Sequence, residues 1–204
     1  MTPVPRTAKG RATRARIVAA AADLIRERGV AGASLDDVLE RAGASKSQLY
    51  LYFPDRMALL REVIRHNADL VLAAQAPHLA ALDSWKAIRA WLDALVRFQV
   101  AAGARGGCPI GSLAGQLVEA DEQARQALAD AFARWEEPLR RGLRSLQVRG
   151  RLDRRADPAR LATATLAAIE GGLLLSQTRR DPDQLAIALD AAYAHLRAHA
   201  VTRG

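Results

Sequence analysis

The run SKSQLYLYF, from Ser45 to Phe53, holds the residue types and spacing most suited to a chemical role. At about 100° per residue, Leu49 and Phe53 share one face of a helix. The opposite face carries Ser47, Gln48 and Leu51, with Lys46 at the N-terminal end. Amide, hydroxyl and aliphatic groups of this kind can hydrogen-bond base edges and pack on a thymine methyl group in the major groove of DNA.

Two tyrosines in the same run, Tyr50 and Tyr52, have two interpretations. Each combines an apolar ring with a hydroxyl, so it can rest on the protein and reach a DNA phosphate. Alternatively the aromatic cluster is a corner of the core, and then both hydroxyls need buried partners. We favour DNA contact for the tyrosines and the core for Leu49 and Phe53.

Three short helices are predicted to position this run. Apolar residues recur at helical spacing from Thr13, and Gly29 and Gly43 are typical C-terminal caps. Ser34 and Ser45 are typical N-caps of the second and third helices, and Pro54 ends the third. Short helices joined by a tight glycine turn predict a helix-turn-helix domain over residues 13–54.

Residues 1–12 contain prolines, a glycine and basic residues but no acidic one, which predicts a disordered basic arm. The arm either follows the minor groove or backbone of DNA or serves as a solubilising tail. The basic residues that could contact DNA are Arg6, Lys9, Arg11 and Arg14.

Helical periodicity continues from Asp55 to the end of the chain, and no segment has the period of a strand. We therefore predict an all-α fold with a larger helical domain over residues 55–204.

Residues 161–176 are small and apolar all round, and two adjacent glycines there favour close approach of another helix. Residues 185–196 supply a partner stripe, so we predict a four-helix interface of a homodimer. The predicted interface comprises Leu161, Thr165, Ala168, Gly171, Gly172, Leu175, Leu185, Ala188, Leu189, Ala192 and Leu196.

The composition narrows the function further. The 204 residues carry a formal net charge of +8, which favours an acidic partner such as double-stranded DNA. Cys108 is the only cysteine, and no stretch is long and apolar enough for a membrane span or a secretory signal, so we expect a cytoplasmic protein without a membrane partner. We find no catalytic constellation, phosphate-binding loop or metal cluster, and expect no enzyme activity, no cofactor and no metal.

The stretch SLDDVLERAGASKSQLYLYFPDRMALLREVI resembles the DNA-binding region of the TetR family of transcriptional regulators. The opening helix RIVAAAADLIRERG also matches, so the likeness covers Thr13 to about Ile64 in order and spacing. The resemblance implies a three-helix DNA-binding domain followed by a helical ligand-binding and dimerisation domain. It assigns DNA contacts to Ser34, Ser45, Lys46, Ser47, Gln48, Tyr50, Leu51, Tyr52 and Arg56.

The resemblance also implies a pocket for a small-molecule effector. Candidate residues are Trp91, Phe98, Cys108, Gln116, Phe132, Trp135 and Glu170. The aromatic residues are either pocket walls or ordinary core, Cys108 is either a sensor thiol or a small buried group, and Glu170 needs a partner from the protein or from a cationic ligand. We predict a dimeric repressor released from a palindromic operator by a small, mostly apolar ligand; the alternative is a non-specific architectural DNA-binding protein.

Overall fold

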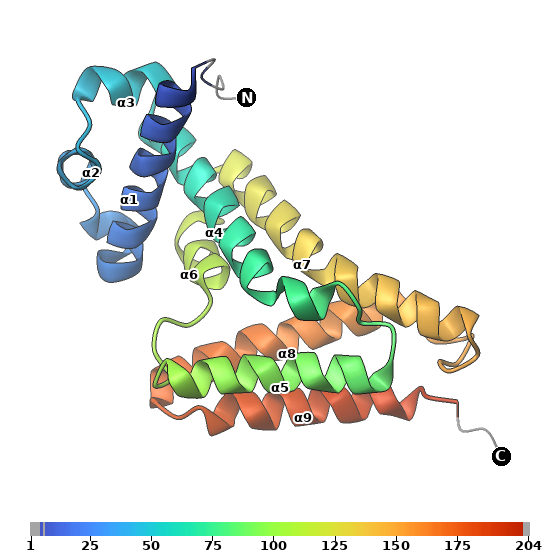
Figure 1. Cartoon of the computed structure of the whole chain (residues 1–204). Coiled ribbons are helices and arrows are strands. Elements are labelled where there is room, and N and C mark those ends of the chain that lie inside the picture. The colour runs from blue at the N-terminus through green and yellow to red at the C-terminus, as the bar shows by residue number, and fades with distance from the viewer. Residues whose placement is uncertain (1–4, 6, 202–204) are drawn as a thin grey trace. The chain divides into compact units, whose positions relative to one another are not determined.

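The structure is a computed structural model that describes Pro5 and residues 7–201 of the chain. These residues form nine helices, and the only extended pairing among them is an isolated antiparallel bridge between Leu152 and Ala200 (Figure 1). The all-α prediction is therefore confirmed. The helices are α1 (Ala8–Gly32), α2 (Leu35–Ala42), α3 (Lys46–Tyr52), α4 (Arg56–Leu79), α5 (Trp85–Ala101), α6 (Pro109–Leu117), α7 (Glu122–Val148), α8 (Pro158–Arg179) and α9 (Asp183–Ala198).

The helices pack into two compact units. The first runs to Leu70 and includes Ser112–Ala131, while the second comprises Val71–Gly111 and the chain from Phe132 onward. The boundary between the units falls within α4, α6 and α7, whereas the domain boundary expected from the sequence is at Asp55. The sequence boundary marks the end of the helix-turn-helix. The compact unit that contains the helix-turn-helix is larger, because it also includes parts of α4, α6 and α7.

The first helix starts earlier than its apolar period suggests. The Thr7 side chain accepts a hydrogen bond from the Gly10 backbone N–H at 3.1 Å, so α1 begins at Ala8 rather than Thr13. Residues 8–12 of the predicted disordered arm are therefore helical. Met1–Val4 and Arg6 lie outside the described residues.

The helix boundaries of the first unit follow local signals. Gly29 has φ of +72° and interrupts the helical geometry of α1, although the helix resumes to Gly32. Ser34 caps α2 by accepting a hydrogen bond from the Asp37 backbone N–H, and Gly43 ends it in the left-handed conformation. Ile17 and Leu24 of α1, Val38 of α2, and Leu49 and Phe53 at α3 are buried together in this small core.

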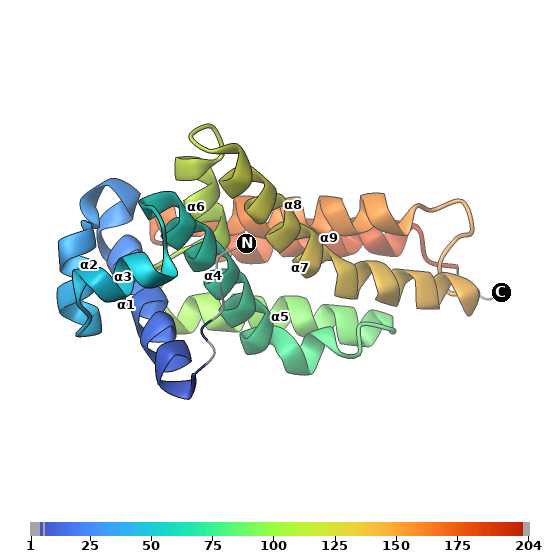
Figure 2. The same ribbon diagram turned by 90° about the horizontal axis from the view of Figure 1, so that it is seen from above.

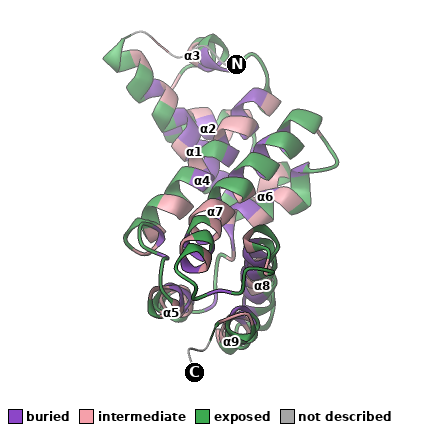
Figure 3. Cartoon of the chain, turned by 90° about the vertical axis from the view of Figure 1, so that its right-hand side faces the viewer, coloured by how far each residue is buried: buried purple, intermediate pink, exposed green. Residues whose placement is uncertain are grey.

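In the second unit α8 packs along α9, and α5 also contacts α9 (Figure 2). A Cβ atom at Gly172 would lie 3.1 Å from the Ala188 Cβ, so the two helices approach closely at this glycine. Arg89 of α5 pairs with Asp93 and with Asp190 of α9. Buried and exposed residues alternate along α8 and α9, so each helix keeps one face at the surface (Figure 3).

Candidate nucleic-acid interface

Helix α3 is held at both ends. The Ser45 Oγ accepts from the Gln48 backbone N–H at 3.3 Å, and the Gln48 Oε1 accepts from the Ser45 backbone N–H at 2.9 Å, which completes a capping box. At the other end the Phe53 backbone N–H donates to the Leu49 carbonyl at 2.8 Å. Because Leu49 and Phe53 are buried, the outward side chains stand on a fixed base.

The outward face of α3 lies where the helical period predicts it. Lys46, Ser47 and Leu51 are exposed, with Leu51 at 67 % of its full exposure and the neighbouring Tyr50 at 49 %. The Ser47 and Ser45 hydroxyls lie 2.9 Å apart. An exposed leucine among polar side chains, on a rigid helix, suits contact with a base methyl group.

Tyr52 does not join this face. Only 7 % of it is exposed, and its ring meets Phe53 edge to face with 6.4 Å between ring centroids. A Cβ atom at Gly10 would lie 3.4 Å from the Tyr52 hydroxyl, which places that hydroxyl against the start of α1. The expected phosphate contact is corrected: Tyr52 packs α3 against α1, and Tyr50 is the tyrosine left at the surface.

Arg56 is also used inside the unit. Its guanidinium donates to the carbonyls of Val30 and Ala33, the latter at 3.0 Å, and so ties α4 to the connection between α1 and α2. Arg56 therefore has a structural role that the sequence did not indicate, and because the residue stays exposed its phosphate contact remains a prediction. Asp55 caps α4 by accepting from the Ala58 backbone N–H at 2.6 Å.

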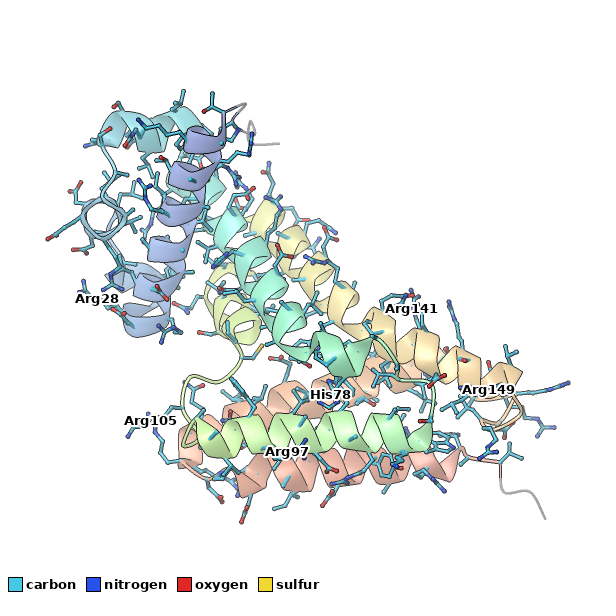
Figure 4. The ribbon with its side chains drawn as sticks, in the orientation of Figure 1. Arg28, His78, Arg97, Arg105, Arg141 and Arg149 are labelled. Carbon is cyan, nitrogen blue, oxygen red and sulfur yellow. The ribbon has the colours of Figure 1, made fainter. Side chains whose placement is uncertain are left out.

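Ser34 is occupied by its own helix. Its hydroxyl accepts from the Asp37 backbone N–H at 3.1 Å and donates to the Asp37 carboxylate at 2.7 Å. These bonds, with Arg28 at 3.4 Å, hold the pKa of Asp37 below its usual value. Arg28 lies near the end of α1 (Figure 4). Ser34 therefore caps α2, and its hydroxyl hydrogen is already used in the bond to Asp37.

Two further predicted residues turn inward within the first unit. Arg14, proposed for the arm, pairs with Glu62 at 2.7 Å, and its guanidinium carbon lies 5.2 Å from the centre of the Phe53 ring. Gln116, a candidate ligand residue, accepts from the Val30 backbone N–H at 2.8 Å. This backbone N–H follows the break at Gly29, so Gln116 completes the end of α1. Sequence reasoning missed that bond because 86 positions separate its partners.

The four aromatic residues predicted as pocket walls differ in their burial. The indole N–H groups of Trp91 and Trp135 donate to the same Gln75 Oε1 at 2.9 and 3.2 Å, and both rings are buried. Phe98 is 67 % exposed, and Phe132 is half-buried. The two tryptophans are core residues joined by Gln75, and Phe98 is a surface residue.

Cys108 and Glu170, by contrast, do lie together in the second unit. The Gly111 backbone N–H donates to the Cys108 Sγ at 3.4 Å, and a Cβ atom at Gly111 would collide with the Glu170 Oε2. Burial raises the pKa of the Cys108 thiol, and the nearby Glu170 carboxylate raises it further. A thiol held neutral in this way is a poor nucleophile, so Cys108 fits a buried structural group better than an oxidant sensor.

Glu170 itself is an unusual group. Burial raises the pKa of its carboxyl group, and its Oε1 has no hydrogen-bond partner among the described residues. Among all the residues that the structure describes, no group of three or more His, Cys, Asp or Glu side chains could hold a metal ion. Within the described residues, no helix has the length and apolarity needed to cross a membrane.

The residues predicted for the dimer interface are divided between the core of the subunit and its surface. Seven of its residues are buried within the subunit and are not available to a second copy: Leu161, Thr165, Gly172, Leu185, Leu189, Ala192 and Leu196. Ala168 and Ala188 are half-buried, and only Gly171 and Leu175 are exposed. The surface of α8 instead carries Ala164, Ala167, Gly171, Leu174, Leu175 and Thr178, and that of α9 carries Ile187, Ala191 and Ala194.

Two family models match the chain. Residues 17–63 match the model described as bacterial regulatory proteins of the tetR family. Residues 84–191 match the C-terminal domain of LmrA/YxaF-like transcriptional regulators. The two matches cover the helix-turn-helix and most of the helical region that follows it.

Curated relatives agree with these matches. An HTH-type transcriptional regulator of Mycobacterium tuberculosis is 34 % identical over 177 residues, covering 82 % of this chain and 86 % of the relative. The HTH-type transcriptional regulator LmrA of Bacillus subtilis is 30 % identical over 176 residues, covering 85 % and 90 %.

Solved structures share the fold. A TetR-family regulator from Cytophaga hutchinsonii superposes with a TM-score of 0.82 at 19 % identity, over 98 % of this chain and all of that one (100 %). A TetR regulator from Chloroflexus aurantiacus gives 0.80 at 24 % identity, over 95 % and 98 %. With these likenesses beside the exposed face of α3, the chain belongs to the TetR family: it is a helix-turn-helix, DNA-binding transcriptional regulator and not an enzyme.

Proposed function

We propose that the protein is a dimeric repressor that binds a palindromic operator and leaves it when a small, mostly apolar ligand binds. The observation that carries the proposal is the face of α3, where Lys46, Ser47 and Leu51 are exposed above the buried Leu49 and Phe53. Lysine supplies a phosphate or guanine contact, while leucine discriminates a thymine methyl group. We expect the protein to act in the cytoplasm, where operator DNA is accessible.

The dimer is supported by the surface of the last two helices. Leu174, Leu175 and Ile187 are large apolar residues that stay exposed in a single subunit. Together with the small residues Ala167 and Gly171 they form an apolar surface of the kind that a second helix pair covers. A twofold dimer of this kind can set two α3 helices about 34 Å apart, on successive turns of the major groove.

The ligand is supported by the group around Glu170. A small-molecule site is mainly apolar with a few polar groups that fix orientation, and the free Glu170 Oε1 is such a group. A ligand that prefers one of two conformations of the dimer shifts the population toward it, and release follows if that conformation spaces the α3 helices wrongly for the operator.

Selection of bound duplexes from a random DNA pool tests the proposal. We expect one palindrome to be enriched, and affinity for it to fall steeply with salt because phosphate contacts release counterions. The Leu51→Ala variant is expected to lose preference at a thymine while keeping non-specific affinity. Affinity for all sequences within a few-fold of one another would support the architectural alternative instead.

The dimer needs its own test. The Leu174→Glu variant places a charge on the proposed interface, and Val148→Glu is the matched control because Val148 is 87 % exposed elsewhere in the second unit. We expect sedimentation to show a monomer for the first variant and a dimer for the second. Retention of the dimer by Leu174→Glu would contradict the assignment of this surface.

A further inference from the structure

The capping box of α3 fixes which part of the Gln48 side chain is available to DNA. Its Oε1 already accepts the Ser45 backbone N–H at 2.9 Å, and its own backbone N–H is held by the Ser45 Oγ. The amide nitrogen Nε2 has no such role in the box. Gln48 is half-buried, and because its acceptor is turned back to the helix start, the hydrogen-bond donors of its amide are the groups that remain for DNA.

This polarity matters for base recognition. A glutamine that reads adenine through two bonds accepts from the N6 amino group and donates to N7, so it needs both ends of its amide. Rotating Gln48 to free Oε1 would leave the Ser45 backbone N–H without its partner at a surface that DNA shields from water. Adenine recognition through two bonds therefore competes with the cap of the recognition helix.

Guanine has the opposite requirement. It presents two adjacent acceptors, N7 and O6, in the major groove and no donor between them. The two hydrogens of the Gln48 amide can serve these acceptors while Oε1 keeps the cap. The exposed side chains beside Gln48 are consistent with such a site, since Lys46 is a donor and Leu51 is apolar, and none of them is a carboxylate that would attract the amino groups of cytosine or adenine.

We propose that Gln48 is a specificity-determining residue that donates to a guanine in each half of the operator and discriminates against adenine at that position. This proposal rests on the proposed function, because it applies to sequence-specific binding. It differs from the general expectation of a base contact in naming the base edge and the atom of Gln48 that reads it.

The test uses base analogues in the selected operator. Each guanine of one half-site is replaced in turn by 7-deazaguanine, which lacks the N7 acceptor, or by inosine, which keeps N7 and O6 and loses only the minor-groove amino group. For the full-length protein we expect one guanine at which 7-deazaguanine weakens binding about tenfold and inosine leaves affinity nearly unchanged. Anisotropy titrations with labelled duplexes give the affinities.

Two variants then assign the effect to Gln48. Gln48→Glu retains an oxygen for the Ser45 N–H but has no N–H to donate, whereas Gln48→Ala loses both functions. In both variants the penalty for 7-deazaguanine at that guanine should disappear, while penalties at other guanines remain. The ratio of affinities for the two duplexes is compared, so that the added charge of Gln48→Glu, which lowers all affinities together, cancels.

The outcomes separate the two proposals. A full tenfold penalty that persists in Gln48→Glu would overturn the assignment of Gln48, as would an enriched adenine whose N6 amino group the wild-type protein requires and Gln48→Ala ignores. If the pool yields no preferred sequence, the proposed function fails and this inference fails with it. An amide exchange measurement at Ser45 checks the cap, since protection should persist in Gln48→Glu and fall in Gln48→Ala.

Discussion

Gly171 and Gly172 of α8 are adjacent in sequence, yet alanine should have opposite effects at the two positions. At Gly172 a Cβ atom would lie 2.8 Å from the Leu185 Cδ1 and 3.1 Å from both the Leu185 Cα and the Ala188 Cβ. At Gly171 a Cβ atom would meet nothing within 4 Å in the subunit. Both variants therefore add one methyl group to the same helix, but only the methyl group at position 172 meets neighbouring atoms.

The magnitudes follow from two terms. Replacing glycine by alanine within a helix stabilises it by about 1 kcal/mol, and this gain applies to both variants. Overpacking a close contact costs about 1–3 kcal/mol, and this cost applies only to Gly172→Ala. The free energies of unfolding should therefore differ by about 1–3 kcal/mol, which corresponds to roughly 2–12 °C in Tm for a chain of this size.

Thermal unfolding followed by circular dichroism at two protein concentrations is the appropriate assay. If the protein forms a dimer, its Tm depends on protein concentration. A dimer weakened by Gly171→Ala would therefore lower Tm only in the dilute sample. The loss for Gly172→Ala should be present at both concentrations. Equal Tm losses for the two variants, independent of concentration, would refute the assignment of Gly172 to the contact inside the subunit and Gly171 to its surface.

Three further predictions concern close contacts and buried groups of the second unit. Gly142→Ala should lower Tm strongly, because its Cβ would collide with the Leu82 carbonyl oxygen. Gly115→Ala, in the part of α6 that belongs to the first unit, is the control with open space around the added methyl group, and equal melting of the two variants would contradict the contact. The Cys108 thiol should react slowly with a thiol reagent at pH 8 and quickly after unfolding in urea, because burial raises its pKa; rapid labelling of the native protein would oppose this. Burial also raises the pKa of the Glu170 carboxyl group. Between the pKa of the unfolded chain and that of the folded protein, the folded protein keeps a proton that the unfolded chain has lost. The free energy of unfolding therefore falls as pH rises through the folded pKa. Glu170→Gln should thus match the wild type in denaturant unfolding below the ordinary glutamate pKa and exceed it at neutral pH, and a constant difference across pH would contradict the buried charge.

The features that could be predicted from sequence depend on neighbours three or four residues apart. Ser34 and Ser45 cap their helices as expected, and Gly43 adopts the left-handed conformation at φ of 57°. Each of these bonds joins residues of one turn, so residue type and spacing determine it. The exposed position of Leu51 follows in the same way from the turn of the helix.

Hydrogen bonds between residues that lie far apart along the chain cannot be predicted in this way. Arg56 has a sequence position suited to DNA, but its partners are the carbonyls of Val30 and Ala33, which only the fold brings near. The Gln116 side chain likewise accepts a hydrogen bond from the distant Val30 backbone N–H. A sequence pattern shows that such a side chain is polar and near a helix end, and it contains no information about which distant backbone group is unsatisfied.

The same difference explains why the exposed face of α3 is easier to predict from sequence than the exposed face of α8. On α3 one face is apolar and the other polar, so the sequence itself separates Leu49 from Gln48. On α8 small and apolar residues surround the helix, and a turn of about 100° between Gly171 and Gly172 is enough to exchange the inside for the outside. Close packing against α9 selects Gly172, because only a residue without a side chain fits beside Leu185, and the opposite apolar face then stays exposed on the subunit. The apolar surface of α8 is therefore a consequence of the contact inside the subunit, and if the proposed dimer forms there, a substitution that repacks α8 on α9 should also change the dimer's stability.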